Sequence, residues 1–131
     1  MKIMIVDDEL VSRSKLTMIL RQFGICHEYD RGDRAVIAFE RALIEKQPYN
    51  LMTLDISMPD MGGMLVLSKI RAIEDRMRVA PENKVVIIMV TSNDEKESFF
   101  TAISQHCNDY IIKPVEKEVM LQRLKKLDLI K

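Results

Sequence analysis

The sequence contains few cysteines and no excess of charge of either sign. Cys26 and Cys107 lack the spacing of metal ligands, and an unpaired pair of this kind suits a reducing compartment. Twenty basic and twenty acidic residues cancel, which argues against a nucleic acid or an anionic membrane surface as partner. We therefore expect two small buried thiols and partners that are not polyanions.

Long apolar runs are also missing. The longest, residues 85–90, is far shorter than the ~20 residues that a membrane span needs. The apolar run that follows Met1 and Lys2 is too short for a secretory signal and meets three acids at once. These features predict a cytoplasmic protein without membrane insertion.

No stretch of the chain reads as a linker. Glycine and proline number four each, and no low-complexity tract or shift in composition divides the sequence. A chain of this length can bury roughly two-thirds of the surface that its unfolded form exposes. Residues 1–131 are therefore predicted to form a single domain.

Short apolar runs alternate with stripes of helical spacing. Strands are expected at Lys2–Val6, Ile25–Tyr29, 50–54, 84–90 and Asp109–Ile112. Helices are expected around 16–23 with a stop at Gly24, around 35–43, from 66 to near 80, from 91–94 to about 105, and around 120–127. This alternation predicts a doubly wound five-stranded parallel sheet covered on both faces, an α/β three-layer sandwich in the order 2-1-3-4-5.

Polar residues follow four of these strands. Asp7 and Asp8 come after the first and Asp55 after the third, where we expect Asp55 to be exposed on the rim of the sheet. Thr91 follows the fourth strand and Lys113 the fifth. Because the carboxyl ends of parallel strands share one edge, the order 2-1-3-4-5 brings these groups around one crevice.

Three carboxylates in one crevice repel each other unless a positive group intervenes. Oxygen ligands without His or Cys indicate a hard cation, and a sparse site of this kind is typical of Mg²⁺. An aspartate at such a site can accept a phosphoryl group. No glycine-rich phosphate loop is present, so the donor is expected to be another phosphorylated molecule, not ATP.

Four segments together resemble the receiver domain of two-component response regulators, which has a flavodoxin-like fold. They are Ile5-Val6-Asp7-Asp8-Glu9, Leu54-Asp55-Ile56-Ser57-Met58-Pro59, Val90-Thr91-Ser92 and Tyr110-Ile111-Ile112-Lys113-Pro114. They stand in the family's order, and the resemblance covers the whole chain.

The resemblance implies a role for each matching residue. Asp55 would accept the phosphoryl group from a phosphohistidine on a sensor kinase. Mg²⁺ would be bound by Asp8, Asp55 and the carbonyl of Ser57, with Asp7 acting through water. Lys113 would bind a phosphoryl oxygen, and its bond to Pro114 would be cis.

By the same resemblance, Thr91 would swing onto the phosphoryl group and Tyr110 would turn inward behind it. The output surface would be built from the fourth helix, the fifth strand and the fifth helix. The expected partners are a sensor histidine kinase and a downstream effector protein, with the chain a monomer or a phosphorylation-dependent dimer.

Three functional hypotheses fit these residues. The leading one is a stand-alone switch that controls other proteins by contact and is not a turnover enzyme. The second is a phosphorelay intermediate that passes the group to a histidine phosphotransfer protein. The third, a phosphohydrolase with an aspartate nucleophile, needs a second acid at the position of Ser57.

Overall fold

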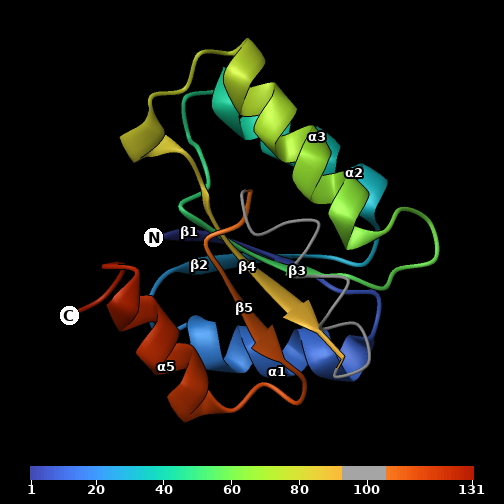
Figure 1. The fold of residues 1–131 in the computed structure, drawn as a ribbon, viewed down its shortest axis with the longest axis vertical. Helices are drawn as coiled ribbons and strands as arrows, with labels where there is room; N and C mark the ends of the chain where they lie inside the picture. Colours follow the sequence, from blue (N-terminus) through green and yellow to red (C-terminus); the bar gives the residue numbers. More distant parts are fainter. Residues whose placement is uncertain (93–105) are drawn as a thin grey trace.

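A five-stranded parallel sheet forms the centre of the molecule (Figure 1). The structure is a computed structural model that describes residues 1–92 and 106–131. The strands are β1 (Lys2–Val6), β2 (Ile25–Tyr29), β3 (Leu51–Asp55), β4 (Val86–Thr91) and β5 (Asp109–Ile112), in the order β2-β1-β3-β4-β5. The predicted fold class and strand order are confirmed, and β2 and β5 are the edge strands.

Helices cover both faces of the sheet (Figure 1). One face carries α1 (Leu10–Leu20) and α5 (Lys117–Lys126), and the other carries α2 (Gly32–Ile44) and α3 (Gly63–Arg76). A short 3-10 turn at Pro81–Asn83 precedes β4. The predicted helix from 91–94 to about 105 falls almost wholly outside the described residues. None of the helices in the described ranges has the length and apolarity that a bilayer crossing requires.

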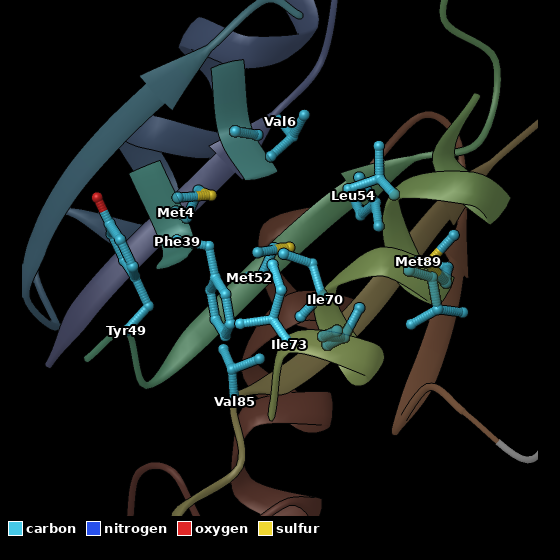
Figure 2. Close-up of a cluster of buried hydrophobic side chains, with 14 of the residues drawn as sticks. Met4, Val6, Phe39, Tyr49, Met52, Leu54, Ile70, Ile73, Val85 and Met89 are labelled. Atoms are coloured by element: carbon cyan, nitrogen blue, oxygen red, sulfur yellow. The ribbon is translucent and has the colours of Figure 1, made fainter. Parts of the chain in front are cut away.

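Two apolar cores lie on the two faces because side chains alternate along each strand. In β1, Ile3 and Ile5 join the core under α1 and α5, whereas Met4 and Val6 join the core under α2 and α3. Figure 2 shows the second core, in which Phe39 of α2 and Ile70 of α3 meet the strands. Both faces of the central strands are thus buried, as a parallel sheet requires.

Two strand boundaries differ from the prediction. The fourth strand was predicted at 84–90 but spans Val86–Thr91, because the backbone N–H of Val85 donates to the carboxylate of Glu74 (2.8 Å) outside the sheet. At the other end, the N–H of Lys113 donates to the carbonyl of Thr91 (2.8 Å) and extends the ladder. The third strand is likewise shifted by one residue and ends on Asp55 itself.

Two helix boundaries also differ. The third helix was predicted to run to about residue 80 but ends at Arg76, because Arg78 adopts a left-handed conformation with φ of 56° that no α-helix accommodates. The first helix, expected around 16–23 with a stop at Gly24, spans Leu10–Leu20 and begins directly after three acids. One of these acids, Asp7, accepts the backbone N–H of Glu9 (2.9 Å).

A buried ion pair joins α3 to the edge of the sheet opposite the predicted crevice. Glu74 is 1% exposed and pairs with Arg71 at 2.7 Å. The remaining donors of Arg71 reach the carbonyls of Val85 and His106 and the side chain of Asn108. Four hydrogen bonds from Arg71 and an acceptor bond on each Glu74 oxygen offset the desolvation penalty of burying this pair. It fixes the chain where it enters β4 and β5.

Gly63, the first residue of α3, lies against the backbone of the strand that carries Asp55. A Cβ atom at this position would lie 2.2 Å from the carbonyl oxygen of Asp55 and 2.8 Å from the Cα of Ile56. Both obstacles are backbone atoms, which cannot rotate away. The neighbouring Gly62 is different, because a Cβ there would meet only the carbonyl oxygen of Ile56 at 3.6 Å, an ordinary contact.

We expect Gly63→Ala to lower the free energy of unfolding by roughly 2–4 kcal/mol, because α3 or the end of β3 must move to relieve the clash. Gly62→Ala is the matched control, and its expected change is about 0.5–1 kcal/mol, because Gly62 is the N-cap of α3, where Ala is less favourable than Gly. Urea denaturation of the two variants and the wild type measures both values. Equal effects of the two substitutions would contradict this account.

Candidate functional site

The predicted site residues meet at the carboxyl edge of the sheet. Asp7 follows β1, Asp55 ends β3, Thr91 ends β4 and Lys113 follows β5. The parallel register places Val6 beside Leu54 and Asp55 beside Val90, so successive strands end at the same level. The structure therefore places the acids and the lysine together at this edge.

Asp7 is fully buried and fixed through its backbone. Its N–H donates to the carbonyl of Tyr29 (3.0 Å), and its own carbonyl accepts from Arg13 Nη1 (2.9 Å). Its carboxylate accepts the N–H of Glu9 on Oδ1, whereas Oδ2 has no hydrogen-bond donor among the described residues. A buried carboxylate oxygen without a donor is costly unless a cation lies nearby.

Lys113 is the cation that the structure places there. Its ammonium lies 3.5 Å from Asp7 Oδ2, 3.4 Å from Asp55 Oδ2 and 3.0 Å from Glu9 Oε1. Burial by itself would lower the pKa of Lys113, but the hydrogen bond to Glu9 and the charges of Asp55 and Asp7 outweigh it and raise that pKa. Lys113 therefore stays charged. Its peptide bond to Pro114 is cis, as the family resemblance implied.

Asp55 is 4% exposed, so the expectation that it stands exposed on the rim was wrong. It ends β3, the strand between β1 and β4, and its Oδ2 lies 3.4 Å from the ammonium of Lys113. Burial, with repulsion from Asp7, raises the pKa of Asp55 to about 7, although Lys113 and a hydrogen bond from the backbone of Ser57 oppose the shift. Access to this carboxylate is through a pocket of about 130 Å³ lined by Glu9, Asp55, Ser57, Ser92 and Lys113.

Three carboxylates can converge on one cation here. Ligand oxygens of Asp7, Asp8 and Asp55 lie within 4.8 Å of one another, with Asp8 exposed and the other two buried. Within this group, Oδ2 of Asp7 is a buried acceptor that receives no hydrogen bond from the described residues. Oxygen-only donors around a surplus of negative charge suit a hard divalent ion such as Mg²⁺. Ser57, predicted to contribute its carbonyl, follows β3 and lines the same pocket.

The two predicted switch residues lie on the neighbouring strands. Thr91 is fully buried, and its hydroxyl donates to the carbonyl of Ser92 (3.0 Å). Tyr110 is a half-buried residue of β5 that packs against the core under α2 and α3. The output surface predicted from the fourth helix, β5 and α5 lies partly outside the described residues.

Glu9 was not predicted as a site residue. In the sequence it is the last of three consecutive acids, of which only Asp7 and Asp8 were predicted to act at the site. In the structure its side chain reaches Lys113, 104 positions away along the chain. No local pattern indicates such a contact, because it depends on how the ends of β1 and β5 are arranged in space.

Comparison with known proteins identifies the family. The sequence pattern of the response regulator receiver domain matches residues 3–125. The chemotaxis protein CheY of Bacillus subtilis is 30% identical over 127 residues, which are 95% of each chain. The regulatory protein TorR of Escherichia coli O157:H7 is 30% identical over 125 residues, but these are only 49% of its own length.

Solved structures show the same fold. The receiver domain of a sensor histidine kinase from Pseudomonas aeruginosa, with a magnesium ion in its active-site cleft, has a TM-score of 0.75 and 26% identity over 95% of this chain and 94% of its own. The CheX–CheY complex of Borrelia burgdorferi, with BeF₃ and magnesium, has a TM-score of 0.77 and 25% sequence identity. The match covers 99% of this chain and 90% of the other.

The raised pKa of Asp55 predicts how stability depends on pH without divalent ions. The folded pKa is about 7 and the ordinary value is 3.8, so folding disfavours the ionised form and stability is lost as pH rises from about 4 to about 7. Asp55→Asn escapes this loss. We expect it to be more stable than the wild type by roughly 2–4 kcal/mol above pH 7, with the difference vanishing near pH 4.

Chemical denaturation in EDTA across this pH range measures the difference. The control is Asp30→Asn, which changes an exposed aspartate that follows β2 at the same edge of the sheet. This control removes a carboxylate from the same edge outside the buried site. A difference between Asp55→Asn and wild type that is independent of pH would refute the buried-carboxylate account.

Proposed function

The chain belongs to the response regulator receiver family of two-component signalling, and from this premise we propose that it is a switch phosphorylated on Asp55 by a phosphohistidine donor. Receiver domains of this kind are signalling switches and not turnover enzymes. The observation that carries the proposal is the buried carboxylate of Asp55, which opens into a small pocket 3.4 Å from a lysine that stays charged.

In the proposed reaction a carboxylate oxygen of Asp55 attacks the phosphorus of the donor phosphohistidine. The oxygen–phosphorus bond forms as the phosphorus–nitrogen bond breaks, and the leaving imidazole takes up a proton from solvent. The chain thereby gains an acyl phosphate. Lys113 lies where a phosphoryl oxygen on Asp55 would arrive, and its charge would stabilise the negative charge that develops there.

The acidic residues fit Mg²⁺, which would neutralise phosphoryl oxygens and the surrounding carboxylates when bound. Asp8, Asp55 and the carbonyl of Ser57 would hold the ion, and Asp7 would act through water. The convergence of three carboxylates and the acceptor oxygen of Asp7 that lacks a hydrogen bond support this assignment. Without a cation the same residues would repel each other.

Output would depend on Thr91 and Tyr110. Their strands, β4 and β5, both end beside the pocket, so a phosphoryl group on Asp55 would bias their side-chain positions. The surface that includes β5 and α5 would then contact an effector protein. A phosphohydrolase is less consistent with the pocket, because Ser57 supplies a hydroxyl where such an enzyme requires a second acid.

An apolar surface beside the pocket fits a protein donor. Leu10 and Val11, at the start of α1, are 65% and 82% exposed. A second pocket of about 400 Å³ includes Val11 and shares Glu9 and Lys113 with the smaller one. Large apolar side chains exposed next to a reactive site indicate a docking surface, which a histidine domain needs and a small phosphodonor does not.

The acceptor assignment predicts that Asp55→Asn abolishes labelling by acetyl phosphate or phosphoramidate, and that EDTA abolishes labelling of the wild type. Phosphate-affinity electrophoresis with mass-spectrometric mapping measures the result. Asp30→Asn is the control and should be labelled at the wild-type rate. Acid-labile label on another residue of Asp55→Asn would disprove the assignment.

The docking surface yields a separate prediction. We expect Val11→Asp to slow phosphotransfer by about tenfold, or ~1.4 kcal/mol, because a buried charge replaces an apolar contact. The donor is the sensor kinase that labels the wild type fastest in a panel from the same organism. Labelling of the variant by acetyl phosphate should stay within twofold of the wild type. Ile37→Asp, at an exposed position on α2, is the control. Equal losses with both donors would argue against docking at Val11.

A further inference from the structure

Among the residues that the structure describes, Glu9 makes the shortest ion pair of the Lys113 ammonium. The ammonium is 3.0 Å from Glu9 Oε1 and donates a hydrogen bond to it, whereas the two aspartates lie 3.4 and 3.5 Å away. The lysine that is placed to receive a phosphoryl oxygen is therefore already engaged by a fourth carboxylate. That carboxylate belongs neither to the predicted metal ligands nor to the phosphoryl acceptor.

The backbone of Glu9 is fixed while its side chain is accessible. The N–H of Glu9 donates to Asp7 Oδ1 at 2.9 Å, and its carbonyl accepts the N–H of Arg13 at 2.9 Å. Glu9 is the N-cap of α1, yet its side chain makes no capping hydrogen bond and reaches across to Lys113. The Glu9 side chain is 66% exposed, against 0% for Asp7 and 6% for Asp55.

This difference in exposure decides which partner Lys113 can release. Asp7 and Asp55 cannot move into water without opening the sheet edge, because both are buried against it. Glu9 can exchange Lys113 for water by side-chain rotation alone. A phosphoryl group on Asp55 would bring oxygens into the pocket that Glu9 and Lys113 both line. The Glu9 contact is thus the one that such oxygens would displace.

The charge of Glu9 also faces that pocket. Four carboxylates (Asp7, Asp8, Asp55 and Glu9) lie around the Lys113 ammonium in the described part of the chain, and the Arg13 guanidinium reaches only the backbone carbonyl of Asp7. A carboxylate at the entrance repels small anions that approach Asp55, and the repulsion weakens as salt screens it. A protein donor that docks on the apolar surface offsets this repulsion with its contact area, whereas a small anionic donor does not.

We propose that Glu9 is a releasable counter-ion that positions Lys113 between phosphorylation events and selects against small anionic phosphodonors. The proposal rests on the proposed function, since it assumes that Asp55 is the acceptor. Glu9 acts through Lys113 and through its charge, so it is a positioning and specificity residue and not a catalytic one.

Glu9→Gln isolates the charge, because the amide oxygen still accepts a hydrogen bond from Lys113. At saturating Mg²⁺ and low ionic strength, labelling by acetyl phosphate should be about three- to tenfold faster than in the wild type. Phosphoramidate, which carries less net negative charge, should show a smaller gain. At ~1 M salt, where the screening length is about 3 Å, both gains should approach unity.

Mg²⁺ affinity supplies a readout that is independent of labelling. Removing a negative charge beside the acidic residues should weaken Mg²⁺ binding by about two- to fivefold, measured by calorimetric titration. The two effects of Glu9→Gln therefore have opposite signs. A distorted site would lose both properties together. The matched control is Glu45→Gln, the same change at an exposed position after α2, which should leave both quantities unchanged.

The outcomes separate this proposal from the proposed function. If neither wild type nor Glu9→Gln is labelled on Asp55, the acceptor assignment fails. If both are labelled at the same rate with the same salt dependence, Asp55 stands and the role of Glu9 is overturned. Parallel loss of labelling and Mg²⁺ affinity in Glu9→Gln would also overturn it. A faster, salt-sensitive reaction with weaker Mg²⁺ binding supports it.

Discussion

The structure depends on the ammonium of Lys113 between two buried carboxylates. Asp7 and Asp55 are nearly inaccessible to water, and their mutual repulsion contributes to the raised pKa of Asp55. Lys113 offsets part of this repulsion, but it comes from β5 while the acids come from β1 and β3. The charges can balance only if the strands end at one level. The strand order of the sheet is therefore also the condition under which the charges of the site can balance.

The rest of the fold holds these strand ends in place. Two apolar cores fix the central strands on both faces, and Gly63 allows α3 to start against the backbone of Asp55. At the opposite edge, Arg71 and Glu74 tie α3 to the residues just before β4 and β5. Apolar packing thus sets the sheet, while buried polar contacts set the positions from which the site residues project.

The proposed switch uses the energy that the fold stores at this edge. A carboxylate buried beside another carboxylate is unfavourable, and cations or a covalent change at Asp55 alter that balance directly. Asp7 and Asp55 are buried charges, whereas Glu9 is an exposed charge that can be displaced. The site therefore combines fixed buried groups with an exposed group that can exchange its partner for water, as a reversible signal requires.

Much of the fold and most of the site were predictable from local patterns. The strands were placed to within two residues, and their carboxyl ends gave the positions of Asp7, Asp55, Thr91 and Lys113, because parallel strands must end at a common edge. The predicted strand boundaries were wrong where a side chain from another element bonds the backbone, as where Glu74 accepts the N–H of Val85. Periodicity cannot report a hydrogen bond made by a side chain on another element.

The sequence by itself determined the alternation of strands and helices, because the spacing of apolar residues is a local property. That alternation in turn determines which residues lie at the carboxyl edge of the sheet. Only the tertiary structure decided that Asp55 is buried and that the carboxylate of Glu9 lies closer to the Lys113 ammonium than those of Asp7 and Asp55. Burial and charge pairing depend on distances between strand ends far apart in the chain. Those distances follow from packing and register, which no single segment encodes.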